Sequence, residues 1–386
     1  MNFIQNDMKN KKNILEYRIK EARIARGLTQ QELADKLNVT KQLLSKYEKG
    51  ATKPSIENLI MISKELDFPI EFFMKEKKIS LDDSRPIFFR SLGSASKKMK
   101  SSLGQNTEFV EEIYDYLSDF IEFPKFNIDK NITKDYKIGV SEEYIENVAN
   151  KLREYWNLGD GPIDNLTKVL EKNGVIITRL ELNTHKVDAF SCMTISGVPI
   201  IVLGSDKGSA VRSRMDISHE LWHILFHSNL SKEDVVNNHK ILEEEAKKFA
   251  GIFTLPSKEF SEDIYSINID NFIYLKKKWK ISIAAMVVRA HDLKIITDEQ
   301  YTYLNKRISF KKWRAKEPLD DLMPLEKPQI LKQAIKLLLE NSVVSIEELT
   351  YNIALSKREI EKFCSLDENY LGGEIKTTKP YLKIIK

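Results

Sequence analysis

Residues 217–226 of this 386-residue chain read Ile-Ser-His-Glu-Leu-Trp-His-Ile-Leu-Phe, and they say more about the fold than any other stretch. Their apolar content predicts a helix packed into a core. His219 and His223 are four residues apart, so on a helix both imidazoles lie on one face and can point at a single ion. Glu220 directly follows the first histidine, where its carboxylate can hold and deprotonate a metal-bound water without binding the metal itself. The stretch therefore predicts a metal site with a catalytic carboxylate.

A third ligand must come from outside this helix. The scheme H-E-x-x-H-x-x-G-x-x-H fails, because Phe226 and Asn229 occupy the positions of its glycine and third histidine. Farther on, residues 243–250 form a helical pattern that opens with three glutamates and could supply an acidic ligand. A set of two histidines and one glutamate around Zn²⁺, with a fourth position open for water, is the remaining choice. His227 lies four residues beyond His223, and we expect it to pack or to support a ligand.

Composition bounds the class of protein. With 386 residues, 42% hydrophobic and 31% charged, the chain predicts a globular protein of two or three domains. No apolar run approaches the roughly 20 residues that span a bilayer, and the polar start is unlike a signal peptide, so we expect no membrane partner. Only Cys192 and Cys364 are present, which fits a reducing cytoplasm. The net charge is +4, but residues 11–66 hold twelve Lys/Arg against seven Asp/Glu, which makes nucleic acid plausible there.

The amino-terminal part predicts a series of short helices. They cover residues 15–26, 29–37, 41–48 and 55–66. Gly27 ends the first of them, and Thr29 with Glu32 forms a capping box at the start of the second. Thr40 caps the third, whose outward positions are polar and basic. Two short helices joined by a tight turn are typical of a helix-turn-helix.

The sequence of residues 18–66 supports that prediction: it reads RIKEARIARGLTQQELADKLNVTKQLLSKYEKGATKPSIENLIMISKEL. It resembles the lambda-repressor-like (XRE) family, with Ala34, Val39 and the string S-x-Y-E-x-G at 45–50 in the family's positions. The resemblance implies an all-α DNA-binding domain that binds double-stranded operator DNA as a homodimer. It implies phosphate contacts by Gln31 and Lys46, and a glutamine such as Gln42 suits adenine. The expected DNA-binding set is Gln31, Thr40, Lys41, Gln42, Ser45 and Lys46.

The middle of the chain changes character several times. Residues 91–102 are rich in Ser, Gly and Lys, a composition typical of a hinge or exposed connection. Helical periodicity returns at 108–123, then at 141–156 with Ser141 as the N-cap, and at 162–173. Strands are expected at 175–180 and 198–203. We expect the edge of the second strand to accept an extended peptide.

Residues 141–318 resemble the ImmA/IrrE metallopeptidase family. That family has R-x-R-x-x-x-x-H-E-L-x-H, then E-x-x-A-x-x-F-A and a proline soon after. The matching residues here are Arg212, Arg214, His219–His223, Glu243, Ala246, Phe249, Ala250 and Pro256, and the strings at 275–293 and 313–318 are also similar to those of long members with an XRE domain. The resemblance implies zinc ligation by His219, His223 and Glu243, with Glu220 as general base. Glu245 is the alternative third ligand, because three adjacent glutamates leave the register open.

These observations predict a multidomain, mainly α protein. We expect an XRE-type helix-turn-helix at 13–76, a linker and helical connection at 77–140, an α+β zincin-like domain with a small sheet at 141–318, and a helical C-terminal extension at 319–386. The resemblances imply a cytoplasmic DNA-binding transcriptional regulator with a zinc-dependent endopeptidase domain. It would act in a prophage, stress or toxin–antitoxin circuit by cleaving or engaging a regulatory protein. The alternative is a non-proteolytic repressor or antitoxin whose peptidase-like domain only binds a partner protein or senses metal.

Overall fold

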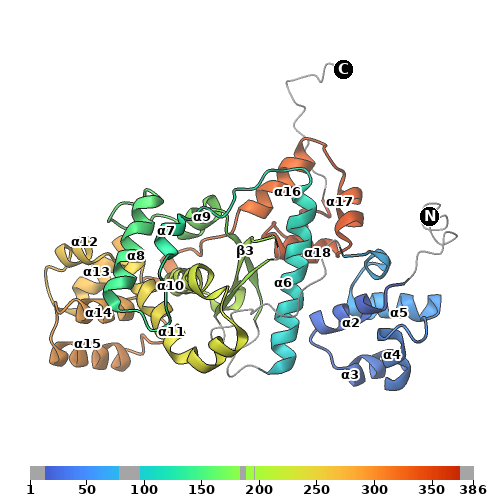
Figure 1. Cartoon of the computed structure of the whole chain (residues 1–386), viewed down its shortest axis with the longest axis horizontal. Helices are drawn as coiled ribbons and strands as arrows, with labels where there is room; N and C mark the ends of the chain where they lie inside the picture. The colour runs from blue at the N-terminus through green and yellow to red at the C-terminus, as the bar shows by residue number, and fades with distance from the viewer. Residues whose placement is uncertain (1–13, 78–95, 183–187, 195, 374–386) are drawn as a thin grey trace, which may run out of the picture. The chain divides into compact units, whose positions relative to one another are not determined.

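A computed structural model describes residues 14–77, 96–182, 188–194 and 196–373. The chain forms two compact units: unit 1 comprises residues 1–81, 94–122 and 331–386, and unit 2 comprises residues 82–93 and 123–330. Helices predominate, and the described strands form a single three-stranded sheet, so the expected multidomain, mainly α class is confirmed (Figure 1). None of the described helices combines the length and the apolar character needed to cross a bilayer.

Unit 1 begins with the expected helical series. Its elements in the first part of the chain are α2 (Glu16–Ala25), α3 (Gln30–Lys36), α4 (Lys41–Glu48), α5 (Ile56–Leu66) and the short 3₁₀ helix η1 (Ile70–Met74). The Thr29–Glu32 capping box and the Thr40 cap are both present. Asn38, between α3 and α4, has a left-handed φ of 53°, which short polar side chains tolerate. The helix-turn-helix prediction is therefore confirmed, and α3, α4 and α5 each begin at a residue whose side chain caps the helix.

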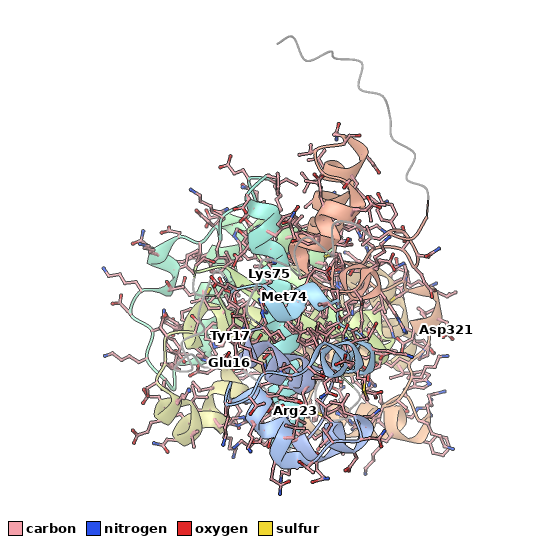
Figure 2. All side chains as sticks on the ribbon, turned by 90° about the vertical axis from the view of Figure 1, so that its right-hand side faces the viewer. Glu16, Tyr17, Arg23, Met74, Lys75 and Asp321 are labelled. Carbon is pink, nitrogen blue, oxygen red and sulfur yellow. The ribbon has the colours of Figure 1, made fainter. Side chains whose placement is uncertain are left out.

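A buried ion pair ties α2 to α4. Arg23 donates from Nε to Glu48 Oε1 at 2.5 Å and from a terminal nitrogen to Glu48 Oε2 at 2.9 Å, and both residues are buried. Gln30 adds a hydrogen bond of 2.8 Å to the same carboxylate. Figure 2 labels Arg23 on α2, with Glu16 and Tyr17 at the start of that helix near Met74 and Lys75 at the end of η1. The paired fork geometry satisfies a carboxylate that burial would otherwise penalise.

The remaining helices of unit 1 come from distant parts of the chain. They are α6 (Lys97–Ser118), α16 (Ile330–Glu340), α17 (Ile346–Ile353) and α18 (Lys357–Phe363). Helix α16 belongs to unit 1 from its second residue, Leu331, onward. The helix expected at 108–123 starts earlier because Ser96 caps it, so 97–102 are helical and not an exposed connection; residues 91–95 lie outside the described residues. Arg26 pairs with Glu359, and Lys75 contacts the carbonyls of Asn352 and Ile353.

Unit 2 places helices around the sheet. Its described strands are β1 (Ile176–Leu180), β2 (Ala189–Met193) and β3 (Pro199–Gly204). Its described α-helices are α7 (Lys130–Thr133), α8 (Glu142–Tyr155), α9 (Leu166–Lys172), α10 (Ala210–Trp222), α11 (Lys232–Thr254), α12 (Ser257–Glu262), α13 (Ile269–Trp279), α14 (Ile283–Asp292) and α15 (Asp298–Phe310). A core formed by α8, α10, α11 and the sheet includes Trp222 and Phe249. A second core, formed mostly by α12–α15, includes Trp279.

The sheet corrects two expectations. The order is β1-β3-β2, with β3 parallel to β1 and antiparallel to β2. β3 is therefore central and fully buried, so the expectation that its edge accepts a peptide is wrong. β2 was not expected, and in the described part of the chain its outer side is an edge of the sheet. The helix expected from 162 starts only at Leu166, because Asn165 caps it.

Two details explain why particular residues occur in unit 2. Gly174 has a φ of +83°, and a Cβ there would lie 2.3 Å from the backbone carbon of Lys125, so only glycine fits. Lys276 is fully buried and pairs with Glu317 at 2.7 Å and Asp320 at 2.5 Å. Glu317 also accepts the backbone N–H of Ile283 at 2.8 Å, at the start of α14. The two separated strings at 275–293 and 313–318 thus meet in one buried cluster.

Candidate metal centre and DNA-reading helices

α10 positions the histidine pair. Arg214, on its first half, is buried and donates to Glu326 and to the carbonyls of Ile163 and Asp164, which anchors the helix. The α-helix ends at Trp222, and residues 223–227 continue as a π-helical turn. Such turns are rare and are frequently found at functional sites.

Three side chains meet on the face that α10 turns toward α11. The Nε2 atoms of His219 and His223 lie 2.9 Å apart. Glu243 approaches both of them, with its Oε2 at 3.4 Å from His219 Nε2 and its Oε1 at 3.4 Å from His223 Nε2. One possible ligand atom from each of the three residues lies within 4.8 Å of the other two. Both histidines are buried.

The types of the three ligand atoms and the distances between them fit a zinc ion. Bonds of about 2.0–2.2 Å at tetrahedral angles place neighbouring ligand atoms about 3.4 Å apart. The two histidine-to-glutamate distances equal that value, and the histidine pair would have to open by about 0.5 Å. Two imidazoles and one carboxylate are also the ligand types typical of a zinc site with an open fourth position. That these residues bind an ion stays a prediction.

Glu220 lies beside this cluster on the same helix. Its side chain is fully buried, and its Oε2 accepts a hydrogen bond of 2.7 Å from the hydroxyl of Ser191. Ser191 belongs to β2, which contacts α10 and the π-helical turn. Ser191 could not be predicted from the sequence, because neither its spacing from His219–His223 nor the short strand that contains it indicates this contact. The buried carboxylate of Glu220 is thus next to His219 in the chain and hydrogen-bonded to strand β2.

The adjacent glutamates of α11 face different partners. Glu243 points to the two histidines, whereas Glu245 is buried against Tyr136 and His227, with its Oε2 at 2.7 Å from the Tyr136 hydroxyl. Glu244 is exposed. Residues two apart on a helix point about 200° away from one another, so Glu243 and Glu245 cannot serve the same site.

The expected DNA-binding residues lie on α3, at the N-cap of α4 and along α4. Gln31, Thr40, Lys41, Gln42 and Lys46 are exposed and Ser45 is half-buried. Thr40 also caps α4, and Gln31 donates to Asp35 at 2.7 Å. The two helices pack on each other and lie beside each other in Figure 1. Their apolar residues Leu33, Ala34 and Leu44 are buried, which leaves the polar set facing outward.

Comparison with known proteins supports both the helix-turn-helix domain and the peptidase-like domain. A helix-turn-helix family model matches residues 19–73, and a peptidase model described as the IrrE N-terminal-like domain matches residues 170–291. The M78 peptidases that the second model describes are a zincin-like metallopeptidase family.

The curated relatives match short stretches of this chain. An uncharacterized HTH-type transcriptional regulator of Rickettsia conorii is 40% identical over 58 residues, which cover 15% of this chain and 46% of the relative. The regulator YqaE of Bacillus subtilis is 33% identical over 72 residues, 18% of this chain and 62% of the relative. The regulator ImmR of Bacillus subtilis is 28% identical over 83 residues, 22% of this chain and 65% of the relative. The chain thus spans about half to two thirds of the length of these relatives. Taken together, the matches show that it joins an XRE-type helix-turn-helix domain to a domain of the IrrE N-terminal-like peptidase family.

Proposed function

We propose that the protein is a transcriptional regulator that binds operator DNA through α3 and α4 and cleaves a protein through a zinc-dependent endopeptidase site in unit 2. The observation that supports the enzymatic half best is the position of Glu220. Glu220 is fully buried and directly follows His219, a member of the His219–His223–Glu243 cluster. Burial of a charged carboxylate costs free energy, and such groups are often found at catalytic sites.

The residues divide the work of peptide hydrolysis. Zinc, when bound, lowers the pKa of a water molecule towards about 7 and polarises the peptide carbonyl. Glu220 accepts the proton of the attacking water and passes it to the leaving amine. The hydroxyl of Ser191 donates to one oxygen of that carboxylate and helps to fix its orientation. The outer side of β2 is suited to align an extended substrate by main-chain hydrogen bonds.

The DNA-binding half rests on the exposed set of α3 and α4. Lys41 and Lys46 supply positive charge for phosphates, and Gln42 has the paired donor and acceptor that suit adenine. Among the matching proteins are regulators named ImmR and the phage CTXphi repressor RstR. The name of the phage repressor supports a circuit of prophage type; a stress or toxin–antitoxin circuit is the other possibility that the proposal includes. In such a circuit the protein would bind as a homodimer, and its substrate would be a regulatory protein.

Replacing Glu220 by glutamine tests the enzymatic half. The variant keeps all three expected ligands, so zinc content should match the wild type, while cleavage should fall between about 100-fold and 10,000-fold. Full-length wild type and E220Q, each with zinc, would be added to a host-cell extract, and new protein N-termini would be quantified by mass spectrometry. Glu244→Gln is the matched control, because it removes an exposed carboxylate next to a ligand. Identical new N-termini for wild type and E220Q would leave unit 2 as a partner-binding or metal-sensing module.

A further inference from the structure

A row of hydrogen-bonding side chains extends behind His223, away from the expected metal. The Nε2 atom of His223 faces His219 and Glu243, whereas its Nδ1 lies 2.7 Å from Nδ1 of His227. The π-helical turn includes both His223 and His227, and both are buried. The second histidine therefore touches a candidate ligand on the side where that ligand cannot bind the ion.

The chemistry of the imidazole ring determines the protons along this row. A histidine that binds metal through Nε2 must have its proton on Nδ1. His223 then donates to Nδ1 of His227, so the proton of neutral His227 must be on its own Nε2. That Nε2 lies 2.9 Å from the hydroxyl oxygen of Tyr136 and 3.4 Å from Oε2 of Glu245. Both of these oxygens can accept the proton.

The row ends at a carboxylate that the backbone holds. Tyr136 donates to Glu245 Oε2 at 2.7 Å, and the backbone N–H groups of Gly139 and Val140 donate to Glu245 Oε1 at 2.6 and 3.2 Å. Burial and the contact with Glu245 raise the pKa of Tyr136, which therefore keeps its proton. Every donor in the row thus has an acceptor.

We infer that His227 is a positioning residue that, backed by Tyr136 and Glu245, fixes the tautomer and the ring orientation of His223 for zinc binding. The inference rests on the proposed metal site. A histidine ligand commonly donates its second ring proton to a carboxylate or carbonyl, and loss of that partner costs about 10-fold to 100-fold in metal affinity. Here the imidazole of His227 is the direct partner of His223, and the carboxylate of Glu245 contacts His227. Glu245 accordingly has a role different from that of a ligand.

Zinc affinity of the full chain, measured by competition with a chromophoric chelator, tests this role without any substrate. His227→Phe keeps an aromatic ring but removes the acceptor, and its zinc dissociation constant should rise about 10-fold to 100-fold. His227→Asn returns an oxygen near the position of Nδ1 and should recover part of the affinity. Tyr136→Phe removes only the hydroxyl behind His227 and should weaken binding less than His227→Phe does.

Tyr144→Phe is the matched control. Tyr144 packs against Phe226, as Tyr136 does, but its hydroxyl donates to the carbonyl of Lys134 at 3.2 Å and does not join the row. It should bind zinc as the wild type does. The unfolding midpoints of the metal-free proteins separate positioning from packing, because a structural role would lower the midpoint of His227→Asn without a matching loss of zinc affinity.

Three results would overturn the inference. The first is wild-type zinc affinity in His227→Phe. The second, should His227→Phe fail to fold, is equal affinity in Tyr136→Phe and Tyr144→Phe. The third is a wild type that binds no zinc, which would refute the metal site itself and is recognised because the unaltered chain fails as well.

Discussion

Glu171 offers a quantitative test of how unit 2 responds to pH. This glutamate of α9 is buried, with 5% of its surface exposed, and its Oε1 accepts the backbone N–H groups of Gln329 and Ile330 at 2.8 and 3.0 Å. Burial raises its pKa to about 7, against the opposing effect of those two hydrogen bonds. The carboxyl is therefore more easily protonated in the folded protein than in the unfolded chain.

The sign and size of the effect follow from this difference. Because the folded state holds its proton more tightly, folding is favoured most below the unfolded pKa of 4.5, and stability declines as the pH rises through about 7. The gap between 4.5 and 7, at about 1.36 kcal/mol for each pKa unit, amounts to about 3 kcal/mol. Between pH 5 and pH 8 the wild type should lose about 2.5 kcal/mol through this group.

Glu171→Gln removes the effect. The glutamine resembles the protonated carboxyl, since its carbonyl oxygen can accept the same two backbone N–H groups while its NH₂ replaces the acid proton. The variant should gain about 2.5 kcal/mol over the wild type between pH 5 and pH 8, and the stability difference should level off above pH 8.

Tryptophan fluorescence during urea unfolding suits the measurement. All four tryptophans, at positions 156, 222, 279 and 313, lie in unit 2, so the signal reports on that unit alone. Glu154→Gln, at an exposed position of α8, controls for the loss of one surface charge. A stability difference between Glu171→Gln and wild type that stays constant from pH 5 to pH 8 would refute the reasoning.

Three further predictions concern the two functional regions and the ion pair between α2 and α4. Purified protein should contain about one zinc ion per chain, and His223→Ala should lose most of it in metal analysis; unchanged content would exclude the site. DNA binding would be measured by anisotropy titrations with the protein's own promoter. Lys46→Ala should weaken binding to all sequences and reduce by about 1 the slope of log affinity against log salt concentration, whereas Gln42→Ala should reduce the discrimination between bases at one base pair by about 1–3 kcal/mol. The opposite pattern would reverse the roles of the two residues. Glu48→Gln leaves Arg23 buried without its charge partner and should cost unit 1 about 3–5 kcal/mol, seen by circular dichroism with tryptophan fluorescence unchanged; a cost below about 1 kcal/mol would contradict the buried pair.

Local signals explain why much of the fold is predictable from sequence. Thr29, Thr40 and Ser141 each cap a helix with their own side chain, and the structure begins those helices at the expected residues. The histidine pair likewise depends only on helical spacing. The choice between Glu243 and Glu245 could not be made in the same way, because it depends on how α11 is rotated against α10.

Features that depend on distant pairing were not predictable. β2 has only five residues and no regular alternation, so it is defined by its register with β3, in which Ser191 pairs with Ile201. The contact from Ser191 to Glu220 follows from that register and from nothing in the motif. The π-helical turn, which brings His227 against His223, also arises from packing and not from a sequence signal.

The discontinuity of unit 1 bears on how the protein is made. Between α6 and the segment that starts at Leu331, the ribosome must synthesise the 208 residues of 123–330. At about 5–20 residues per second, this takes roughly 10–40 s. During that interval Arg26 has no Glu359 and Lys75 has no Asn352 to contact. Newly made chains should therefore pass through a period in which the amino-terminal helices of unit 1 lack their carboxyl-terminal partners while unit 2 is still being synthesised, and chaperones would be expected to bind them during this period.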